Sequence, residues 1–272
     1  MNKPPFFLSP PRTRSTLLYE LAEDAAINYH GLRPIINHSE LFLEFNYSNR
    51  VFNYRENVEY PTELYPIIYD GNMHIHYIYP YVHNSLEKRN NYKVKILKEA
   101  RDLGLEFYFK GTMQCAECPD LVEFYKNRHW VITKRKDIVE QIISTLYAGT
   151  ISIFTIRQDE ANIKAYNKAT SQKVTINLSG SSREEYIKTF IPRVNKTHAI
   201  ERELILKGID YTIAYYEDLE TEDAIVEKMI EIIGDKNWKP KHGFSPTVKR
   251  SIPYEDLIEN YSEVRNYIEG LL

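Results

Sequence analysis

Apolar residues occur along this chain in two patterns, as short continuous runs typical of buried strands and at the spacing of a helix. Where the second pattern follows the first directly, we predict a strand that runs into a helix. The first apolar run, residues 5–8, ends at two prolines, and a polar turn rich in hydroxyl groups follows it. Leu17, Leu21 and Ala25 then fall on one stripe of a helix, with acidic residues on the other side. The pattern therefore predicts a strand-to-helix junction near the N-terminus.

A second junction of the same kind is predicted further along the chain. The apolar run 130–134 reaches Arg135, and Asp137 is placed to cap a helix. Apolar residues then recur at helical spacing up to Leu146. Arg135 is thus expected at the carboxyl end of a strand, where open α/β sheets bind their ligands.

Strands and helices alternate in the rest of the chain as well. We predict helices and strands in turn over 86–103, 105–110, 183–207 and 209–216, and helical structure over 254–271. This alternation is typical of an α/β fold with a mainly parallel sheet and helices on both faces. At 272 residues, we interpret the chain as a single domain, residues 1–272.

Composition and charge narrow the range of functions. A net charge of -3 argues against a nucleic-acid binder that works through bulk charge. No run of about 18 apolar residues is present, and the N-terminus lacks the apolar stretch of a signal peptide, so we expect no membrane span and a cytoplasmic location. Cys115 and Cys118 are the two cysteines, and without a second ligand pair we expect them to be structural and reduced.

The first junction has the layout of an anion-binding site. Backbone N–H groups at the start of a helix have no partner within the helix, and the helix dipole adds partial positive charge there. Arg12 would supply a cation, and Ser15 and Thr16 would supply hydroxyl donors. The alternative is that the prolines only end the strand and the hydroxyl residues only cap the helix.

The residues of this junction resemble a known loop. Residues 11–18 are similar to the Pro-(Arg/Lys)-Ser-Gly-(Ser/Thr)-Thr-Leu-Leu loop of sulfotransferases, which holds the 5'-phosphosulfate of 3'-phosphoadenosine 5'-phosphosulfate (PAPS). The resemblance implies a P-loop-NTPase-like sulfotransferase architecture. It implies cofactor contacts for Arg12, Thr13, Arg14, Ser15 and Thr16. Arg14 stands where the family has glycine, a residue that lets the backbone approach a phosphate closely.

The second junction resembles the motif that holds the 3'-phosphate in the same family. In that motif an arginine at a strand end and a serine on the next helix bind the phosphate, and Arg135 and Ser144 have the matching spacing. The form Arg-x-Asp-x-x-x-Gln-x-x-Ser, present here, is typical of bacterial members. A Tyr-Glu-Asp-Leu turn at residues 216–219 also resembles the family.

The resemblance further implies candidates for the chemistry. An acceptor hydroxyl loses its proton as it attacks sulfur, and we expect Glu40, or as second choice His38, to take that proton. Lys110 is similar to a lysine that contacts the sulfuryl group in cytosolic members, although the histidine two residues after that lysine is absent here. The alternatives are that Glu40 lies in the first turn of a short helix and that Lys110 is an ordinary surface residue.

Two segments are expected to complete the site. Residues 46–95 hold nine of the 22 tyrosines and few helix signals, and we interpret them as an acceptor-binding insert. The alternative is that these tyrosines pack an irregular core. Residues 235–272 are expected to cover the cofactor, with Lys249 and Arg250 near its 3'-phosphate and Trp238 stacked on adenine.

Together these observations predict transfer of a sulfuryl group from PAPS to a hydroxyl or amine of a small-molecule, carbohydrate or peptide acceptor, without a metal. The Walker A and G-x-G-x-x-G patterns of other nucleotide-binding proteins are absent from the sequence. Two alternatives stay open: a P-loop-like kinase, and a nucleotide-binding protein with the same fold but no catalytic activity. The sequence specifies neither the acceptor nor the oligomeric state.

Overall fold

The computed structural model describes residues 3–26, 33–34, 65–69, 72–76, 98, 102, 110–111, 120–151, 168–241 and 252–272. The strands of the main sheet are β1 (Phe6–Leu8), β5 (Lys110–Gly111), β6 (Trp130–Lys134) and β7 (Tyr211–Tyr215). The helices are α1 (Ser15–Ala25), α4 (Leu121–Phe124), α5 (Ile138–Thr150), α7 (Ser181–Leu206), α8 (Glu222–Ile233), α9 (Tyr254–Leu257) and α10 (Tyr261–Leu271), with a 3-10 turn η4 (Tyr216–Leu219).

The four strands form a parallel sheet in the order β5-β1-β6-β7. From β1 the chain leads to β5 on one side, whereas from β6 it leads to β7 on the other side. The order of the strands therefore reverses between β1 and β6, and the loops that follow these two neighbours lie at the same edge of the sheet. This is the edge at which both predicted junctions begin.

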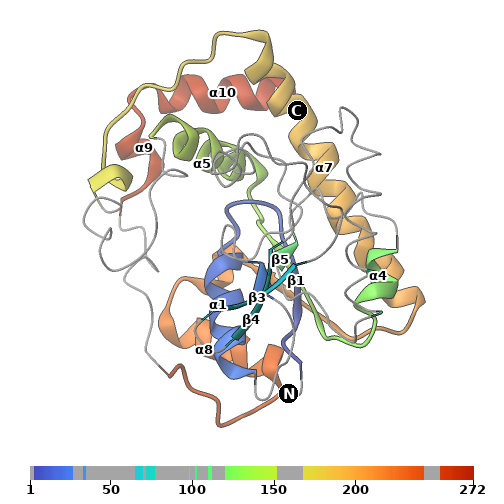
Figure 1. Cartoon of the computed structure of the whole chain (residues 1–272). Helices are drawn as coiled ribbons and strands as arrows, with labels where there is room; N and C mark the ends of the chain where they lie inside the picture. The colour runs from blue at the N-terminus through green and yellow to red at the C-terminus, as the bar shows by residue number, and fades with distance from the viewer. Residues whose placement is uncertain are drawn as a thin grey trace.

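Helices cover both faces of this sheet, as the alternation of apolar runs predicts (Figure 1). On one face, Phe7 packs with residues of α1 and α8 in a core that includes Leu18 and Met229. On the other face, Phe6 stacks on Tyr125 beside α4, with ring centroids 4.4 Å apart. All three residues of β1 are fully buried, which is what an interior parallel strand requires.

Trp238 belongs to the core of the first face and not to the ligand site. It is 9% exposed and packs in the same cluster as α1 and α8. The expectation that this indole stacks on adenine is therefore not supported, because its surface is already used in packing.

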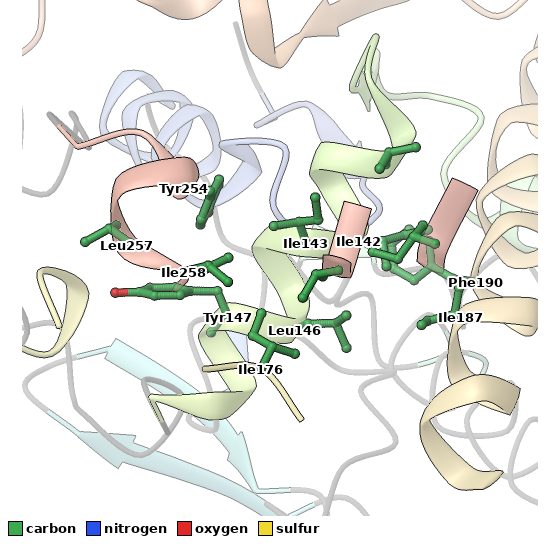
Figure 2. Close-up of a cluster of buried hydrophobic side chains, with 14 of the residues drawn as sticks. Ile142, Ile143, Leu146, Tyr147, Ile176, Ile187, Phe190, Tyr254, Leu257 and Ile258 are labelled. Atoms are coloured by element: carbon green, nitrogen blue, oxygen red, sulfur yellow. The ribbon is translucent and has the colours of Figure 1, made fainter. Parts of the chain in front are cut away.

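A second core lies among helices beyond the main sheet (Figure 2). Residues of α5, α7, α9 and α10 meet there, together with Ile176 from the segment before α7. Ile142 and Ile187 are completely buried in this cluster. We refer to it below as the helical core. Within the described stretches, no helix is both long and apolar enough to cross a membrane.

The C-terminal helical segment is two helices, whereas the sequence pattern predicts one. The chain leaves α9 at Ile258, which forms a parallel bridge with Val174. The Asn260 side chain then holds the Ile176 main chain at both polar groups, accepting from its N–H at 2.9 Å and donating to its carbonyl at 3.0 Å. These contacts replace the helical hydrogen bonds and end α9 before α10 begins.

A small second sheet lies partly within the tyrosine-rich range 46–95. Strand β4 (Asn72–His76) pairs antiparallel with β3 (Tyr65–Tyr69) and parallel with β2 (Arg33–Pro34). The remainder of 46–95, most of the predicted helix 86–103, and Cys115 and Cys118 lie outside the described residues.

Candidate anion-binding site

The loop between β1 and α1 has a left-handed backbone at two arginines. Arg12 has φ 64° and Arg14 has φ 58°, values that L-residues other than glycine rarely adopt. Arg14 thus takes the glycine-like conformation itself, at a cost of about 1 kcal/mol relative to glycine. The Thr13 hydroxyl between them is fully buried and donates to the Pro10 carbonyl at 2.9 Å, so it stabilises the loop from inside.

Helix α1 starts directly after this loop without a capping side chain. Arg14 is the N-cap residue, and its side chain accepts no hydrogen bond from the first turn. The first N–H groups of the helix therefore keep their partial positive charge for an external acceptor. Ser15 is buried, and Thr16 is only partly exposed.

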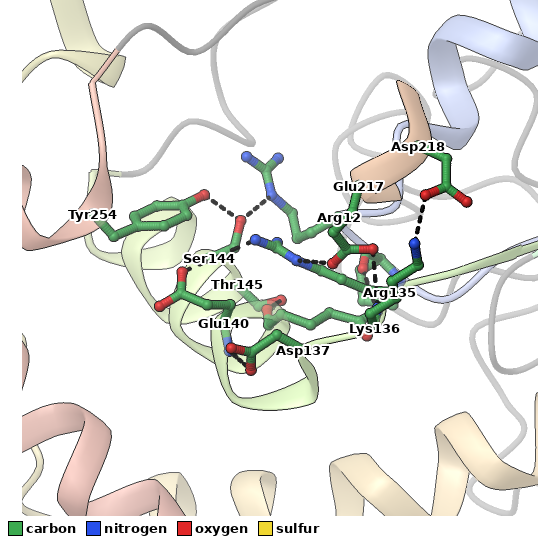
Figure 3. A network of polar contacts seen from close by, with 12 residues as sticks. Arg12, Arg135, Lys136, Asp137, Glu140, Ser144, Thr145, Glu217, Asp218 and Tyr254 are labelled. Atoms are coloured by element: carbon green, nitrogen blue, oxygen red, sulfur yellow. Dashed lines mark hydrogen bonds and ion pairs between the residues drawn. The ribbon is translucent and has the colours of Figure 1, made fainter. Parts of the chain in front are cut away.

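Side chains from α5 fasten this loop to the second junction (Figure 3). Arg12 Nε donates to Ser144 Oγ at 3.0 Å, and the same Ser144 hydroxyl contacts the Tyr254 hydroxyl. Gln141 Nε2 donates to the Pro11 carbonyl at 2.7 Å. The two segments that the sequence singled out, 132 residues apart at Arg12 and Ser144, are thus in direct contact.

Arg135 is held at the end of β6 by charge and by an aromatic ring. Its side chain is only 7% exposed, with Glu217 Oε1 3.7 Å from Nε and Glu140 Oε2 4.0 Å from Nη2. Its guanidinium carbon lies 4.3 Å from the ring centroid of Tyr216. Within the described part of the chain, Nε has no hydrogen-bond partner although it is buried. Such a group is a donor available to a ligand.

Lys110 is placed on the opposite side of the loop, at the end of β5. It is 5% exposed, and its ammonium donates to Thr16 Oγ1 at 2.7 Å. The alternative of an ordinary surface lysine is therefore wrong. Lys110 is thus a fourth cation on this edge of the sheet, besides Arg12, Arg14 and Arg135, and its ammonium lies against the first turn of α1.

Glu20 stands one turn further along α1 and carries an unusual pKa. Although Glu20 is exposed, surrounding protein desolvates it enough to raise the pKa of its carboxyl to about 7, while the Lys110 ammonium opposes the shift. A carboxyl with a pKa near neutrality is suited to accept a proton. The sequence pattern predicts only a solvent-facing helix residue at Glu20, since the desolvation that raises its pKa comes from the folded protein around it.

Several predicted site residues lie outside the described residues, namely Glu40, His38, Lys249 and Arg250. Those that are described meet at one place: Arg12, Thr13, Arg14, Ser15 and Thr16 in the loop, with Lys110, Arg135 and Ser144 around it. The sequence reasoning did not select Gln141, Tyr216 or Tyr254. Gln141 and Tyr216 do stand in quoted motifs, whereas no local pattern marks Tyr254.

This arrangement can bind an anion through several positive charges and N–H donors. Guanidinium groups, an ammonium and uncapped helix N–H groups converge on the edge where β1 and β6 end. Among the described residues, no group of three or more His, Cys, Asp or Glu side chains is placed to hold a metal ion. A ligand here would be bound by cations and N–H donors from the protein.

Comparison with known proteins adds no relative to this picture. No protein-family model matches the chain, and neither the curated proteins nor the solved structures contain a match to it.

Proposed function

We propose that this protein is a sulfotransferase that binds PAPS at the β1–α1 and β6–α5 junctions. The observation that carries the proposal is the hydrogen bond from Arg12 to Ser144, with Arg135 beside it. It brings together two motifs whose resemblance assigns them to the two phosphate-bearing ends of one cofactor. An ordinary 5'-nucleotide has no 3'-phosphate and would need only the first motif, at the β1–α1 junction.

The chain's residues fit the cofactor in charge and in donor geometry. The uncapped start of α1, with Thr16 and Lys110, would bind the 5'-phosphosulfate, and Arg135 with Ser144 would bind the 3'-phosphate. The buried Nε of Arg135, which has no hydrogen-bond partner among the described residues, is a donor that a phosphate oxygen can use. The interior position of β1 in the sheet is compatible with the P-loop-like architecture that the proposal implies.

The reaction is an in-line transfer. The acceptor oxygen or nitrogen forms a bond to sulfur while the bond from sulfur to the phosphate oxygen breaks, and the acceptor proton passes to a base. Glu40 and His38 remain the proposed bases. Lys110 and Arg12 would stabilise negative charge as it develops on the leaving phosphate, because preorganised cations act most strongly where charge forms.

Calorimetric binding of 3'-phosphoadenosine 5'-phosphate (PAP), the product of the transfer, tests the proposal. We expect wild type to bind PAP about 100-fold more tightly than 5'-AMP, and Arg135→Ala to lose that preference, because a charged hydrogen-bonded contact contributes 2 kcal/mol or more. Equal affinity for PAP and 5'-AMP in the wild type would overturn the proposal. Tight binding of ATP that requires magnesium would support a P-loop-like kinase instead.

A further inference from the structure

Two guanidinium groups lie over the same aromatic ring at this site. The guanidinium carbon of Arg14 is 4.7 Å from the ring centroid of Tyr216, and that of Arg135 is 4.3 Å from it. Tyr216 begins the η4 turn directly after β7, the neighbour of β6 in the sheet. The side chain of Arg14 therefore crosses from the β1–α1 loop towards the ends of β6 and β7.

Of the two guanidinium groups at this ring, only that of Arg135 is paired with carboxylates among the described residues. Glu217 and Glu140 lie within 4.0 Å of Arg135, whereas Arg14 forms no ion pair with any described residue. Both arginines also carry a buried nitrogen that has no hydrogen-bond partner in the described part of the chain, Nη1 of Arg14 and Nε of Arg135. Like charges repel at this distance, so an anion that accepts from both would stabilise the pair.

The shape and charge of the pair define what that anion is. A phosphomonoester carries close to two negative charges at neutral pH and three acceptor oxygens, which match two guanidinium groups. A phosphodiester or a sulfate ester carries one negative charge and would be attracted less strongly to the two guanidinium groups. The site around Tyr216 is therefore built for a terminal phosphate.

We infer that Arg14, positioned by the ring of Tyr216, binds the same phosphomonoester as Arg135, although the sequence places Arg14 in the loop for the other end of the ligand. The inference rests on the proposed function, in which that phosphomonoester is the 3'-phosphate of the cofactor. Arg14 thus substitutes for a glycine in the loop and at the same time serves as a specificity residue for the 3'-phosphate.

Three ligands distinguish binding at the 3'-phosphate from binding at the 5'-phosphate: PAP carries both phosphates, 3'-AMP only the first and 5'-AMP only the second. We expect Arg14→Gly to weaken PAP and 3'-AMP about tenfold and to leave 5'-AMP unchanged in competition binding, since one charge-assisted contact is lost at the 3'-phosphate alone. The variant should fold at least as stably as wild type because glycine adopts a positive φ without strain. Its melting temperature therefore serves as the folding control.

Variants of the tyrosines test the positioning role. Tyr216→Phe keeps the ring and should bind all three ligands as wild type does, whereas Tyr216→Leu should weaken PAP and 3'-AMP about tenfold through loss of the cation–π contacts. Tyr215→Leu is the matched control, because the Tyr215 ring contacts Lys136 and neither arginine. We expect this control to bind all three ligands as wild type does.

Each other result has a definite meaning. If Arg14→Gly weakens 5'-AMP and PAP but not 3'-AMP, Arg14 serves the 5' end and the inference is wrong. If Arg14→Gly changes nothing while Arg135→Ala still abolishes the preference for PAP, the inference is wrong and the proposed function stands. If wild type shows no preference for PAP over 5'-AMP, both are wrong.

Discussion

Arg135 and Arg265 approach the same carboxylate, Glu140, but in different surroundings. Arg265 lies 3.3 Å from Glu140 Oε1, 3.5 Å from Asp137 and 2.9 Å from Glu269, so its charge is met by carboxylates. Arg135 lies 4.0 Å from the other Glu140 oxygen and 3.7 Å from Glu217, and its buried Nε has no hydrogen-bond partner among the described residues. One arginine joins α10 to α5, and the other retains donors for a ligand.

The comparison shows how a structural cation differs from a binding cation at the same helix terminus. The hydrogen bond that Arg265 donates to the Tyr261 hydroxyl and the charge of Asp137 raise the pKa of Arg265 further above its ordinary value. Arg135 is instead oriented by the face of Tyr216, which attracts the guanidinium without occupying its N–H groups. An aromatic ring can therefore hold an arginine in place and leave it able to bind an anion.

The largest expected effect is a contrast in ligand binding between the two arginines. Arg135→Ala should lose about 100-fold in affinity for PAP, whereas Arg265→Ala should stay within about twofold of wild type, because only Arg135 has donors left for a phosphate. Calorimetry with PAP on both variants measures the contrast. A comparable loss in both variants would break the distinction.

His198 resembles Arg135 in having a buried nitrogen without a hydrogen-bond partner among the described residues, but it lies outside the candidate site. Its Nε2 also has no hydrogen-bond partner among the described residues, yet it lies on α7, beside Lys134 and Glu201. Burial, with the nearby Lys134 charge, lowers the pKa of His198 from 6.5 to about 4. The unfolded chain therefore binds a proton at His198 at a higher pH than the folded protein does, and stability falls as pH drops from 6.5 towards 4.

We expect this acid sensitivity to be on the order of 2 kcal/mol between pH 7.5 and 4.5. His198→Gln should remove that part of the pH dependence and leave binding of PAP unchanged. Urea unfolding of both proteins across this range measures it. Parallel pH profiles would show that His198 does not contribute.

Arg265 should contribute more to stability than Arg135 does. Because its side chain is 34% exposed, its ion pairs are screened, and Arg265→Ala should lower the free energy of unfolding by about 1 kcal/mol. Arg135→Ala should change it less, because the ion pairs that it removes are longer, at 3.7 and 4.0 Å. Urea denaturation curves in 0.05 M and 1 M salt compare the two, and the Arg265 effect should shrink at high salt.

The smallest expected effect concerns Glu20, a carboxyl whose desolvation outweighs the attraction of Lys110. Its pKa of about 7 lies above the value of 4.5 for an unperturbed glutamate, so Glu20 lowers stability progressively as pH rises from 4.5 to 7, and the full loss is present above pH 7. Glu20→Gln should match wild type below pH 4.5 and be slightly more stable at pH 8. The difference in melting temperature between the two proteins at these pH values checks the sign, and an advantage confined to low pH would contradict it.

Local patterns predict the two junctions because each depends on neighbours in the sequence. The apolar runs of β1 and β6 and the stripes of α1 and α5 repeat within one element, and Asp137 caps α5 by accepting from the N–H of Glu140 as predicted. The hydrophobic pattern within a single element is enough to predict a strand that is buried on both faces or a helix with one apolar stripe.

The surroundings of the site depend on contacts between residues far apart in the sequence, which the spacing of apolar residues does not predict. Tyr216 meets Arg14 and Arg135 only because β7 pairs with β6, and Tyr254 reaches Ser144 only because α9 packs on the helical core. The same reason explains the two incorrect expectations. Trp238 is taken up by packing against α1 and α8, and the C-terminal helix is interrupted by Asn260, which bonds to Ile176.

The Ser144 contacts also determine when this site can exist during synthesis. Ser144 touches Arg12 near one end of the sequence and Tyr254 near the other. A ribosome releases the chain from its N-terminus onwards, so the loop containing Arg12 emerges first, Ser144 next and Tyr254 last. The contact of Ser144 with Tyr254 can therefore form only after its contact with Arg12 has become possible, and a chain truncated before Tyr254 would lack it.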